Sequence, residues 1–396
     1  MKIAKIEDAK RVLEPIISKT PLVHATKIHD NLWIKAENLQ GTGAFKLRGA
    51  YYKLSNLNEE EKAKGVIAAS AGNHAQGVAY SCMKMGIQGT IVMPKTAPLS
   101  KIEATKAYGV KVELQGDTFN DAYEYAKNLQ EITGAVFIEP FNDEDVIAGQ
   151  GTIGMEIIEK MPDVDTVIVP IGGGGLISGI AYAIKTLRPH CRIVGVQSEK
   201  AASMKTSLEK QKIMTLKEVS TIADGIAVMN PGEKTVKLIQ ENVDEMVSVS
   251  DDEIAATILL LLEREKLVVE PAGASSLAAV LNHKMDVTAK RVVCVLSGGN
   301  IDVSFIHKVV EKGLVTRGRN IKFKTLMLDV PGSLEHFAHI VKEANANIIE
   351  VQYDRIQADL NLNETIIHVA VEVSSKEHGD ALIKALKQKG YEITME

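Results

Sequence analysis

The chain has 396 residues, of which 45% are hydrophobic and 24% are charged, an ordinary composition for a globular protein of two to four domains. Its net charge of −5 and its 4% of aromatic residues argue against a nucleic-acid binder, which needs a basic face and stacking rings. The three cysteines are far apart and the first residues carry charges throughout, so we expect no disulfide framework, no signal peptide and a cytoplasmic protein.

The first 315 residues alternate short apolar runs with longer helical patterns. The runs predict strands at 32–37, 66–69, 90–93, 110–114, 166–171, 192–197 and 292–296. Several are apolar throughout, which is typical of strands covered on both faces in a parallel sheet. A capping box that begins at Ser250 and a proline at Pro271 predict two helix starts. The alternation predicts an α/β body over 1–315, with a small subdomain at about 49–140 inserted in the larger one.

The pattern restarts after a basic, glycine-containing segment, KGLVTRGRN. This segment predicts a linker, which we place at 316–320, ahead of a second domain at 321–396. The second domain is expected to contain strand 321–330, helix 334–345, strands 347–354 and 364–373, helix 377–389 and strand 391–395. This βαββαβ order is the ferredoxin-like arrangement.

An uncharged run from 166 to 184 is long enough to be considered as a membrane span, but it contains a proline and four consecutive glycines. The run contains a predicted strand and then a predicted helix. Between them lie four glycines, Gly172, Gly173, Gly174 and Gly175. Bare backbone N–H groups and the helix dipole make such a loop a phosphate cradle. The alternatives are a tight turn, which does not need four glycines, and a dinucleotide site, whose GxGxxG spacing fits neither Gly172 nor Gly173. We predict a phosphate site and no membrane span.

Four further motifs lie at the expected ends of strands or starts of helices. They are TGAFKLRG at 42–49, SAGNHAQG at 70–77, EPAG at 270–273 and SGGN at 297–300. Lys46 lies in a glycine-flanked turn and is either a solvated surface lysine or, in a desolvated pocket, an amine nucleophile and base. Loops at the carboxyl ends of parallel strands meet at one sheet edge, where ligands bind in open α/β folds.

Together with the glycine loop at 172–175, these motifs make five. In their order along the chain and at their separations, they resemble the pyridoxal-phosphate-dependent threonine/serine dehydratases of fold type II, the tryptophan-synthase β-like group. The resemblance covers about residues 5–315 and implies two parallel-sheet αβα subdomains. It also implies an ammonia-lyase reaction that converts L-threonine to 2-oxobutanoate and L-serine to pyruvate. The tail resembles an ACT regulatory domain, whose first strand-to-helix loop matches DVPGSL at 329–334.

The resemblance implies a role for individual residues. Lys46 is expected to hold pyridoxal 5′-phosphate as a Schiff base and then to remove the Cα proton of the substrate. The expected cofactor contacts are Phe45 near the ring, Asn73 at the ring hydroxyl, Gly172, Gly173, Gly174 and Gly175 at the phosphate, and Ser297 at the pyridine nitrogen. The expected contacts of the substrate carboxylate are Ser70, Gly72 and His74. A hydroxyl at the ring nitrogen makes a weaker electron sink than a carboxylate, which favours β-elimination over transamination.

The ACT-like tail implies regulation. We expect an effector near Pro331, Gly332 and Ser333, namely isoleucine or valine, with AMP as an alternative because catabolic relatives respond to it. A domain that serves only in oligomerisation is the simpler alternative. We also expect a homodimer or a homotetramer.

Two other functions are compatible with the same scaffold. A racemase needs a second proton donor, and the eukaryotic serine racemases that the chain resembles use a serine for it. This chain has Ala71 at that position. Alanine cannot transfer a proton, so dehydration is favoured over racemisation. A nonenzymatic amino-acid sensor is disfavoured because Lys46 and the glycine-rich loops are all retained.

Metal binding is not expected. Those racemases bind a divalent cation through an acid where this chain has Ser220, although Asp224 is retained and could serve a monovalent ion. His336 and His339 are spaced to share one helix face, but no third ligand is evident.

Overall fold

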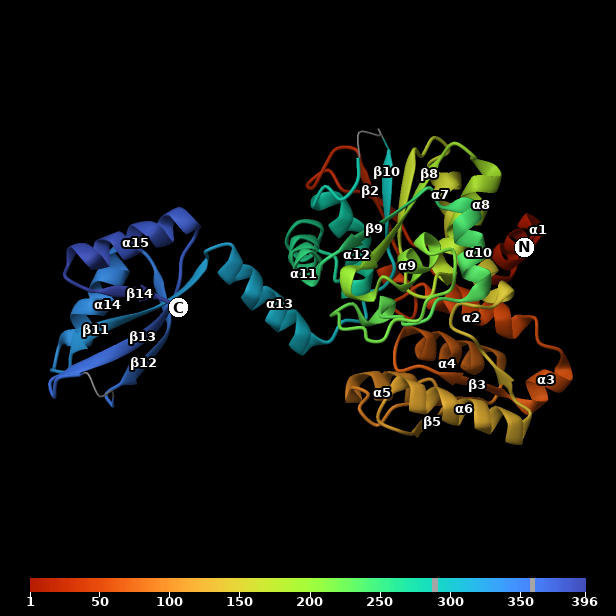
Figure 1. Ribbon diagram of the computed structural model, residues 1–396, viewed down its shortest axis with the longest axis horizontal. Helices are drawn as coiled ribbons and strands as arrows, with labels where there is room; N and C mark the ends of the chain where they lie inside the picture. Colours follow the sequence, from red (N-terminus) through yellow and green to blue (C-terminus); the bar gives the residue numbers. More distant parts are fainter. Residues whose placement is uncertain (287–290, 357–359) are drawn as a thin grey trace. The chain divides into compact units, whose positions relative to one another are not determined.

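The structure is a computed structural model that describes residues 1–286, 291–356 and 360–396 (Figure 1). It divides into two compact units, Met1–Asp302 and Val303–Glu396. Within the described residues, no helix is both long and apolar enough to cross a bilayer. The uncharged run at 166–184 instead forms a buried strand, the glycine loop and a helix.

The larger sheet of the first unit has the strand order β1-β2-β10-β7-β8-β9. Its strands are β1 (Leu22–His24), β2 (Leu32–Ala36), β7 (Thr166–Pro170), β8 (Arg192–Ser198), β9 (Glu245–Val249) and β10 (Val292–Leu296). All neighbours are parallel except β1, which is antiparallel to β2. Every residue of β7 and β10 is buried, which explains why these strands are apolar throughout. The accompanying helices are α1 (Ile3–Leu13), α7 (Glu144–Lys160), α8 (Gly175–Leu187), α9 (Ser203–Glu209), α10 (Glu233–Asn242), α11 (Asp251–Leu260) and α12 (Pro271–Leu281).

The smaller sheet is parallel and has the order β5-β4-β3-β6. Its strands are β3 (Val66–Ala69), β4 (Gly89–Met93), β5 (Lys111–Leu114) and β6 (Val136–Phe137), and its helices are α3 (Glu59–Lys64), α4 (Asn73–Met85), α5 (Leu99–Lys106) and α6 (Phe119–Thr133). It forms the orange part of the chain in Figure 1. Helix α2 (Lys46–Ser55) packs against both α4 and α7, so its first residue, Lys46, lies where the two subdomains meet.

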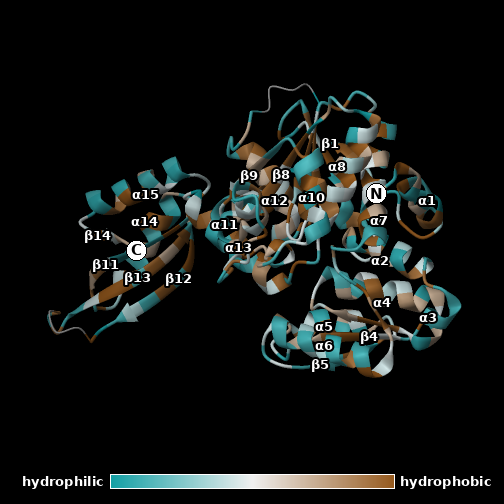
Figure 2. Cartoon of the chain, turned by 45° about the vertical axis from the view of Figure 1, so that its right-hand side comes forward, coloured by the Kyte–Doolittle hydropathy of each residue, from teal (hydrophilic) through white to brown (hydrophobic). Residues whose placement is uncertain are grey.

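The second unit is built on an antiparallel sheet of order β12-β13-β11-β14, which confirms the predicted βαββαβ arrangement. Its elements are α13 (Val303–Thr316), β11 (Asn320–Leu328), α14 (Ser333–Glu343), β12 (Asn347–Asp354), β13 (Glu364–Glu372), α15 (Lys376–Gln388) and β14 (Ile393–Met395). Its core packs Phe323 and Val371 of the sheet against Phe337 and Leu382 of the helices. Figure 2 shows hydrophobic colours inside the first unit and hydrophilic colours on outer helices such as α3 and α15.

The structure differs from the sequence prediction in two places. Three strands, β1, β6 and β9, were not predicted, because β1 and β6 contain only three and two residues and β9 is an edge strand with little continuous apolar sequence. The segment from Lys312 was predicted to be a linker, yet α13 continues to Thr316 through Gly313, and α13 groups with the second unit. Only residues 317–319 separate α13 from β11.

Candidate active site

Lys46 is the first residue of α2, so the motif at 42–49 is a helix start and not a turn throughout. Its Nζ atom donates a hydrogen bond to the carbonyl oxygen of Pro140 at 2.7 Å, and the residue keeps partial solvent access. Burial lowers the pKa of Lys46 to about 8, and the opposing attraction of Glu270 is the smaller influence. The amine is therefore held by protein groups, which is not the geometry of a solvated surface lysine.

The loop between β3 and α4 carries the next group of predicted residues. Ser70 Oγ accepts a hydrogen bond from the backbone N–H of Gly72 at 3.2 Å, and α4 begins without a side-chain cap. The buried His74 donates from Nε2 to the carbonyl oxygen of Ile138 at 2.8 Å. Burial, followed by the neighbouring charge of Lys46, lowers the pKa of His74 to about 3, so this ring is neutral at physiological pH.

Asn73 is part of a hydrogen-bond network that joins three distant motifs. Its Nδ2 atom donates to Glu270 Oε1 at 2.7 Å, and its Oδ1 atom accepts from Asn300 Nδ2 at 2.8 Å. Asn300 Nδ2 also donates to the carbonyl oxygen of Thr42 at 2.8 Å. The motifs that begin at positions 42, 70, 270 and 297 therefore meet at one place, and those at 70 and 297 directly follow the parallel strands β3 and β10.

The glycine loop lies between β7 and α8 and is closely packed. A Cβ atom at Gly173 would lie 2.3 Å from the ring of Phe141, and one at Gly175 would lie 2.9 Å from its Cα atom. Gly174 has a φ of +95°, and a Cβ there would lie 2.8 Å from Thr235. Close packing thus accounts for these glycines as fully as ligand binding does. Because α8 also begins without a side-chain cap, its first N–H groups suit a phosphate, and the loop fits pyridoxal phosphate.

The segment that follows β6 links the lysine to the glycine loop, and the sequence reasoning missed it. Its carbonyl groups at Ile138 and Pro140 accept the bonds from His74 and Lys46, and Phe141 lies against Gly173. The signal that could have identified it is the polar, proline-containing stretch EPFN immediately after an apolar strand, like the other site loops.

The last two predicted cofactor residues are Ser297, which directly follows β10, and Phe45, which directly precedes α2. Ser297 is buried, its carbonyl oxygen accepts the backbone N–H of Phe45 at 3.1 Å, and Ala44 forms a bridge with Gly298. The Lys46 Nζ atom lies 5.3 Å from the centre of the Phe45 ring. These contacts bring Phe45, Lys46 and Ser297 together.

The candidate cation residue Asp224 forms an ion pair with Lys101 of α5, and its Oδ1 atom accepts the backbone N–H of Gly225 at 2.8 Å. In the described parts of the chain, no three His, Cys, Asp or Glu side chains are grouped as metal ligands. The ring of His336 stacks on Tyr391, with the two ring centres 6.5 Å apart.

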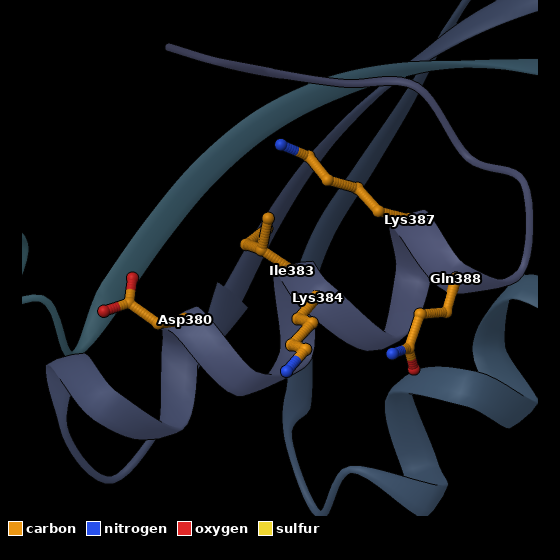
Figure 3. Close-up of a pocket in the computed structure, with 5 residues that line it drawn as sticks. All are labelled: Asp380, Ile383, Lys384, Lys387 and Gln388. Atoms are coloured by element: carbon orange, nitrogen blue, oxygen red, sulfur yellow. The ribbon is translucent and has the colours of Figure 1, made fainter.

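The predicted effector residues lie in the second unit. Pro331 and Gly332 connect β11 to α14, which begins at Ser333 without a side-chain cap, and Gly332 has a φ of +90°. A hollow along α15 is lined by Asp380, Ile383, Lys384, Lys387 and Gln388 (Figure 3). Figure 3 shows Lys384 and Lys387 extending in opposite directions, and none of these five residues belongs to the predicted effector loop.

Comparison with known proteins identifies the class to which this fold and site belong. Residues 13–298 match the family described as pyridoxal-phosphate dependent enzyme. The chain is 47% identical to an L-threonine ammonia-lyase of Thermotoga maritima over 98% of both chains. It is also 47% identical to the catabolic L-threonine dehydratase TdcB of Escherichia coli K12, over 78% of this chain and 95% of that one.

Solved structures agree with this classification. Threonine deaminase isoform 2 of Solanum lycopersicum matches with a TM-score of 0.74 at 41% identity, covering 78% of this chain and 87% of that one. Maize serine racemase matches with a TM-score of 0.75 at 36% identity, covering 80% of this chain and 98% of that one. The site is that of a fold type II pyridoxal-phosphate enzyme. The chain belongs to the pyridoxal-phosphate-dependent enzyme family.

Proposed function

We propose that this protein is an L-threonine ammonia-lyase that converts L-threonine to 2-oxobutanoate and ammonia and L-serine to pyruvate and ammonia. The observation that carries the proposal is the amine of Lys46, which is held by the carbonyl oxygen of Pro140 and whose pKa, lowered to about 8, suits it to act as both nucleophile and base near neutral pH. The proposal agrees with the names of the relatives that match over nearly the whole chain.

Each step can be assigned to residues of this chain. Bound pyridoxal phosphate supplies an electron sink for the Cα atom that loses its proton. Lys46 would hold the cofactor through its amine, and the same amine, once freed by the incoming substrate, would remove the Cα proton. The β-hydroxyl would leave as water with a proton returned by Lys46, whose amine would then take up the cofactor again and so free the unsaturated amine. Addition of water to that amine would give the 2-oxo acid and ammonia.

The other site residues bind and orient. We propose that the N–H groups at Gly172, Gly173, Gly174 and Gly175 hold the cofactor phosphate. We propose that Asn73 binds the ring hydroxyl, Phe45 lies beside the ring and the Ser297 hydroxyl donates to the ring nitrogen. Ser70, Gly72 and the first turn of α4, which includes His74, surround the substrate carboxylate. Because His74 is neutral, it contributes to carboxylate binding through the backbone at the start of α4 and not through an imidazolium charge.

The proposal is tested by measuring 2-oxo acid production from L-threonine and L-serine. The purified protein should be yellow, and both substrates should yield their 2-oxo acids. A colourless protein that binds an amino acid would instead be a sensor. Formation of D-serine would indicate a racemase, but the Ala71 methyl group packs against the small-subdomain core and offers no proton.

For the second unit, we propose an ACT domain whose loop at Pro331, Gly332 and Ser333 binds isoleucine or valine, with AMP as the alternative effector. The uncapped start of α14 supports the proposal, because its N–H groups suit an effector carboxylate or phosphate. Deleting the residues after Thr316 should preserve catalysis and abolish the response to the effector. The Escherichia coli relative, which matches over 313 residues and 95% of its own length, supports the independence of the body.

A point variant sharpens this test. Gly332 and Gly390 both have a φ of +90°, and a Cβ atom at either would meet open space. Gly332→Ala should therefore weaken the effector response, while Gly390→Ala imposes the same backbone strain away from the loop and should leave it intact. An equal loss in both variants would contradict the assignment.

We further propose a homodimer or homotetramer in the cytoplasm. Leu326 and Leu328 are exposed on the face of β11 opposite its buried residues, which supports association of this sheet face. The three cysteines are free and buried, as is usual in a reducing compartment. Light scattering of the full chain with and without isoleucine tests the assembly.

A further inference from the structure

Glu270 is a buried carboxylate that the steps above do not use. It precedes α12 as its N-cap residue and is only 5% exposed. A Cβ atom at Gly298 would lie only 2.4 Å from the Oε1 atom of Glu270, so the glycine at 298 makes room for the carboxylate. Among the described residues, the carboxylate accepts from the Asn73 side-chain amide and from the backbone N–H of Asn300, and no lysine or arginine forms an ion pair with it. A buried carboxylate without a paired cation is costly, which calls for a function.

The Asn73 amide can adopt only one orientation beside this carboxylate. Its Oδ1 atom accepts from Asn300 Nδ2 at 2.8 Å, and its Nδ2 atom donates to Glu270 Oε1 at 2.7 Å. Reversal of the amide would place Oδ1 against the carboxylate and Nδ2 against the Asn300 donor, so both bonds would be lost. The second hydrogen on Asn73 Nδ2 is then the one left for the cofactor hydroxyl.

We propose that Glu270 is a positioning residue that holds Asn73 so that its free N–H is presented to the cofactor beside Lys46. This inference rests on the proposed function, because it concerns the same cofactor site. Glu270 acts through Asn73 and exchanges no atom with the substrate.

The charges around Glu270 make this role dependent on pH. Burial, and then the charge of Asp224, raise the pKa of Glu270 to about 7, while Asn73, Lys101 and the backbone N–H of Asn300 act in the opposite direction. Lys46 also interacts with this carboxylate, since the charge of Glu270 raises the pKa of Lys46. As the pH rises through about 7, Glu270 gains its charge and becomes a stronger acceptor for Asn73.

The test compares Glu270→Ala and Glu270→Gln in the full-length protein with its cofactor. The readouts are cofactor affinity, the pH titration of the visible absorption band, and kcat and KM for L-threonine. Glu270→Ala should weaken cofactor binding by about 10- to 100-fold, the range for loss of a hydrogen bond to a charged group. Glu270→Gln keeps an acceptor for Asn73, so it should bind within about tenfold of wild type but lose the titration near pH 7.

Glu253 provides a control for loss of a carboxylate charge away from the site. It closes the capping box of α11 and pairs with Lys284 at 2.9 Å, so Glu253→Gln should keep the cap, remove the ion pair and leave cofactor affinity and the absorption band unchanged. Wild-type affinity and an unchanged band titration in Glu270→Ala would overturn the proposal. So would effects in Glu270→Gln no different from those in Glu253→Gln.

Two substitutions at neighbouring charges test the charge argument without altering Glu270. Lys101 and Asp224 form an ion pair and shift the pKa of Glu270 in opposite directions. Lys101→Ala should therefore move the band titration to higher pH, and Asp224→Asn should move it to lower pH. Shifts of the same sign would contradict the inference. If the wild-type protein failed to deaminate L-threonine, the proposed function would be refuted but the role of Glu270 would not. Cofactor affinity and the titration of the absorption band would still test that role.

Discussion

The Nζ atom of Lys46 lies 2.7 Å from the carbonyl oxygen of Pro140, one residue before Phe141, whose ring lies against Gly173. The amine and the glycine loop are thus connected through two adjacent residues of one segment. A change in the glycine loop that displaces Phe141 should also displace the hydrogen-bond acceptor of Lys46.

Gly173→Ala tests this connection. The new methyl group would lie 2.3 Å from the Phe141 ring, so the ring must move, and we expect a loss of about 1–3 kcal/mol in unfolding free energy together with weaker cofactor binding. Denaturant unfolding and cofactor titration measure the two effects. Gly41→Ala is the control, because the nearest atom to its methyl group is 4.0 Å away. Unaltered cofactor affinity in Gly173→Ala would disprove the connection.

Lys46→Ala should remove the visible band and lower the rate with L-threonine by at least about 100-fold, since both the attachment point and the base are lost. Spectra and 2-oxo acid assays measure these changes. Lys53 lies in the same helix but pairs with Asp143 at 2.8 Å and Asp145 at 3.3 Å. Lys53→Ala should retain colour and activity. A yellow, active Lys46→Ala protein would show that another residue holds the cofactor.

The rate at which cofactor-free protein recombines with pyridoxal phosphate should rise with pH and level off above about 8. Attachment needs an uncharged amine, and the pKa of Lys46 is lowered to about 8 by burial. At pH 7.5 this leaves about a quarter of the amine uncharged, against about 0.1% at an ordinary lysine pKa. Stopped-flow absorbance from pH 6 to 10 measures the profile. A rate that keeps rising to pH 10 would indicate an ordinary lysine.

The same profile in Glu270→Gln provides an internal check. Glu270 raises the pKa of Lys46, so its neutralisation should make the profile level off at a lower pH than in wild type. A profile displaced to higher pH would contradict the assigned interaction.

Arg48 should be essential for stability. It is fully buried, donates from Nε and Nη2 to Glu37 at 2.8 Å, and donates from Nη1 to Glu156 at 2.6 Å. Arg48→Met leaves the carboxylate of Glu37 buried and unpaired, which should cost about 3–5 kcal/mol in unfolding free energy. Urea unfolding measures this, and the double variant Arg48→Met/Glu37→Met should recover part of the loss. A cost below about 1 kcal/mol for the single variant would contradict the reasoning.

Much of the architecture could be predicted from local sequence because its signals are local. Continuous apolar runs identified β3 and β10 with the observed bounds, since strands covered on both faces need no polar residues. The capping box at Ser250 and the proline at Pro271 marked helix starts that the structure confirms, because caps depend on neighbouring residues only. The order of elements in the tail likewise determined its ferredoxin-like fold.

Only the tertiary structure decided how the site is supported. The hydrogen bond between Asn73 and Glu270 joins residues 197 positions apart, and that between Lys46 and Pro140 joins residues 94 positions apart. No periodicity or spacing encodes such pairs, because they form where two separate sheets meet. The sequence by itself determined the order of the glycine-rich motifs and predicted Lys46 as the residue that attaches a cofactor. Burial and neighbouring charges, which exist only in the folded chain, decided the pKa values of Lys46, His74 and Glu270.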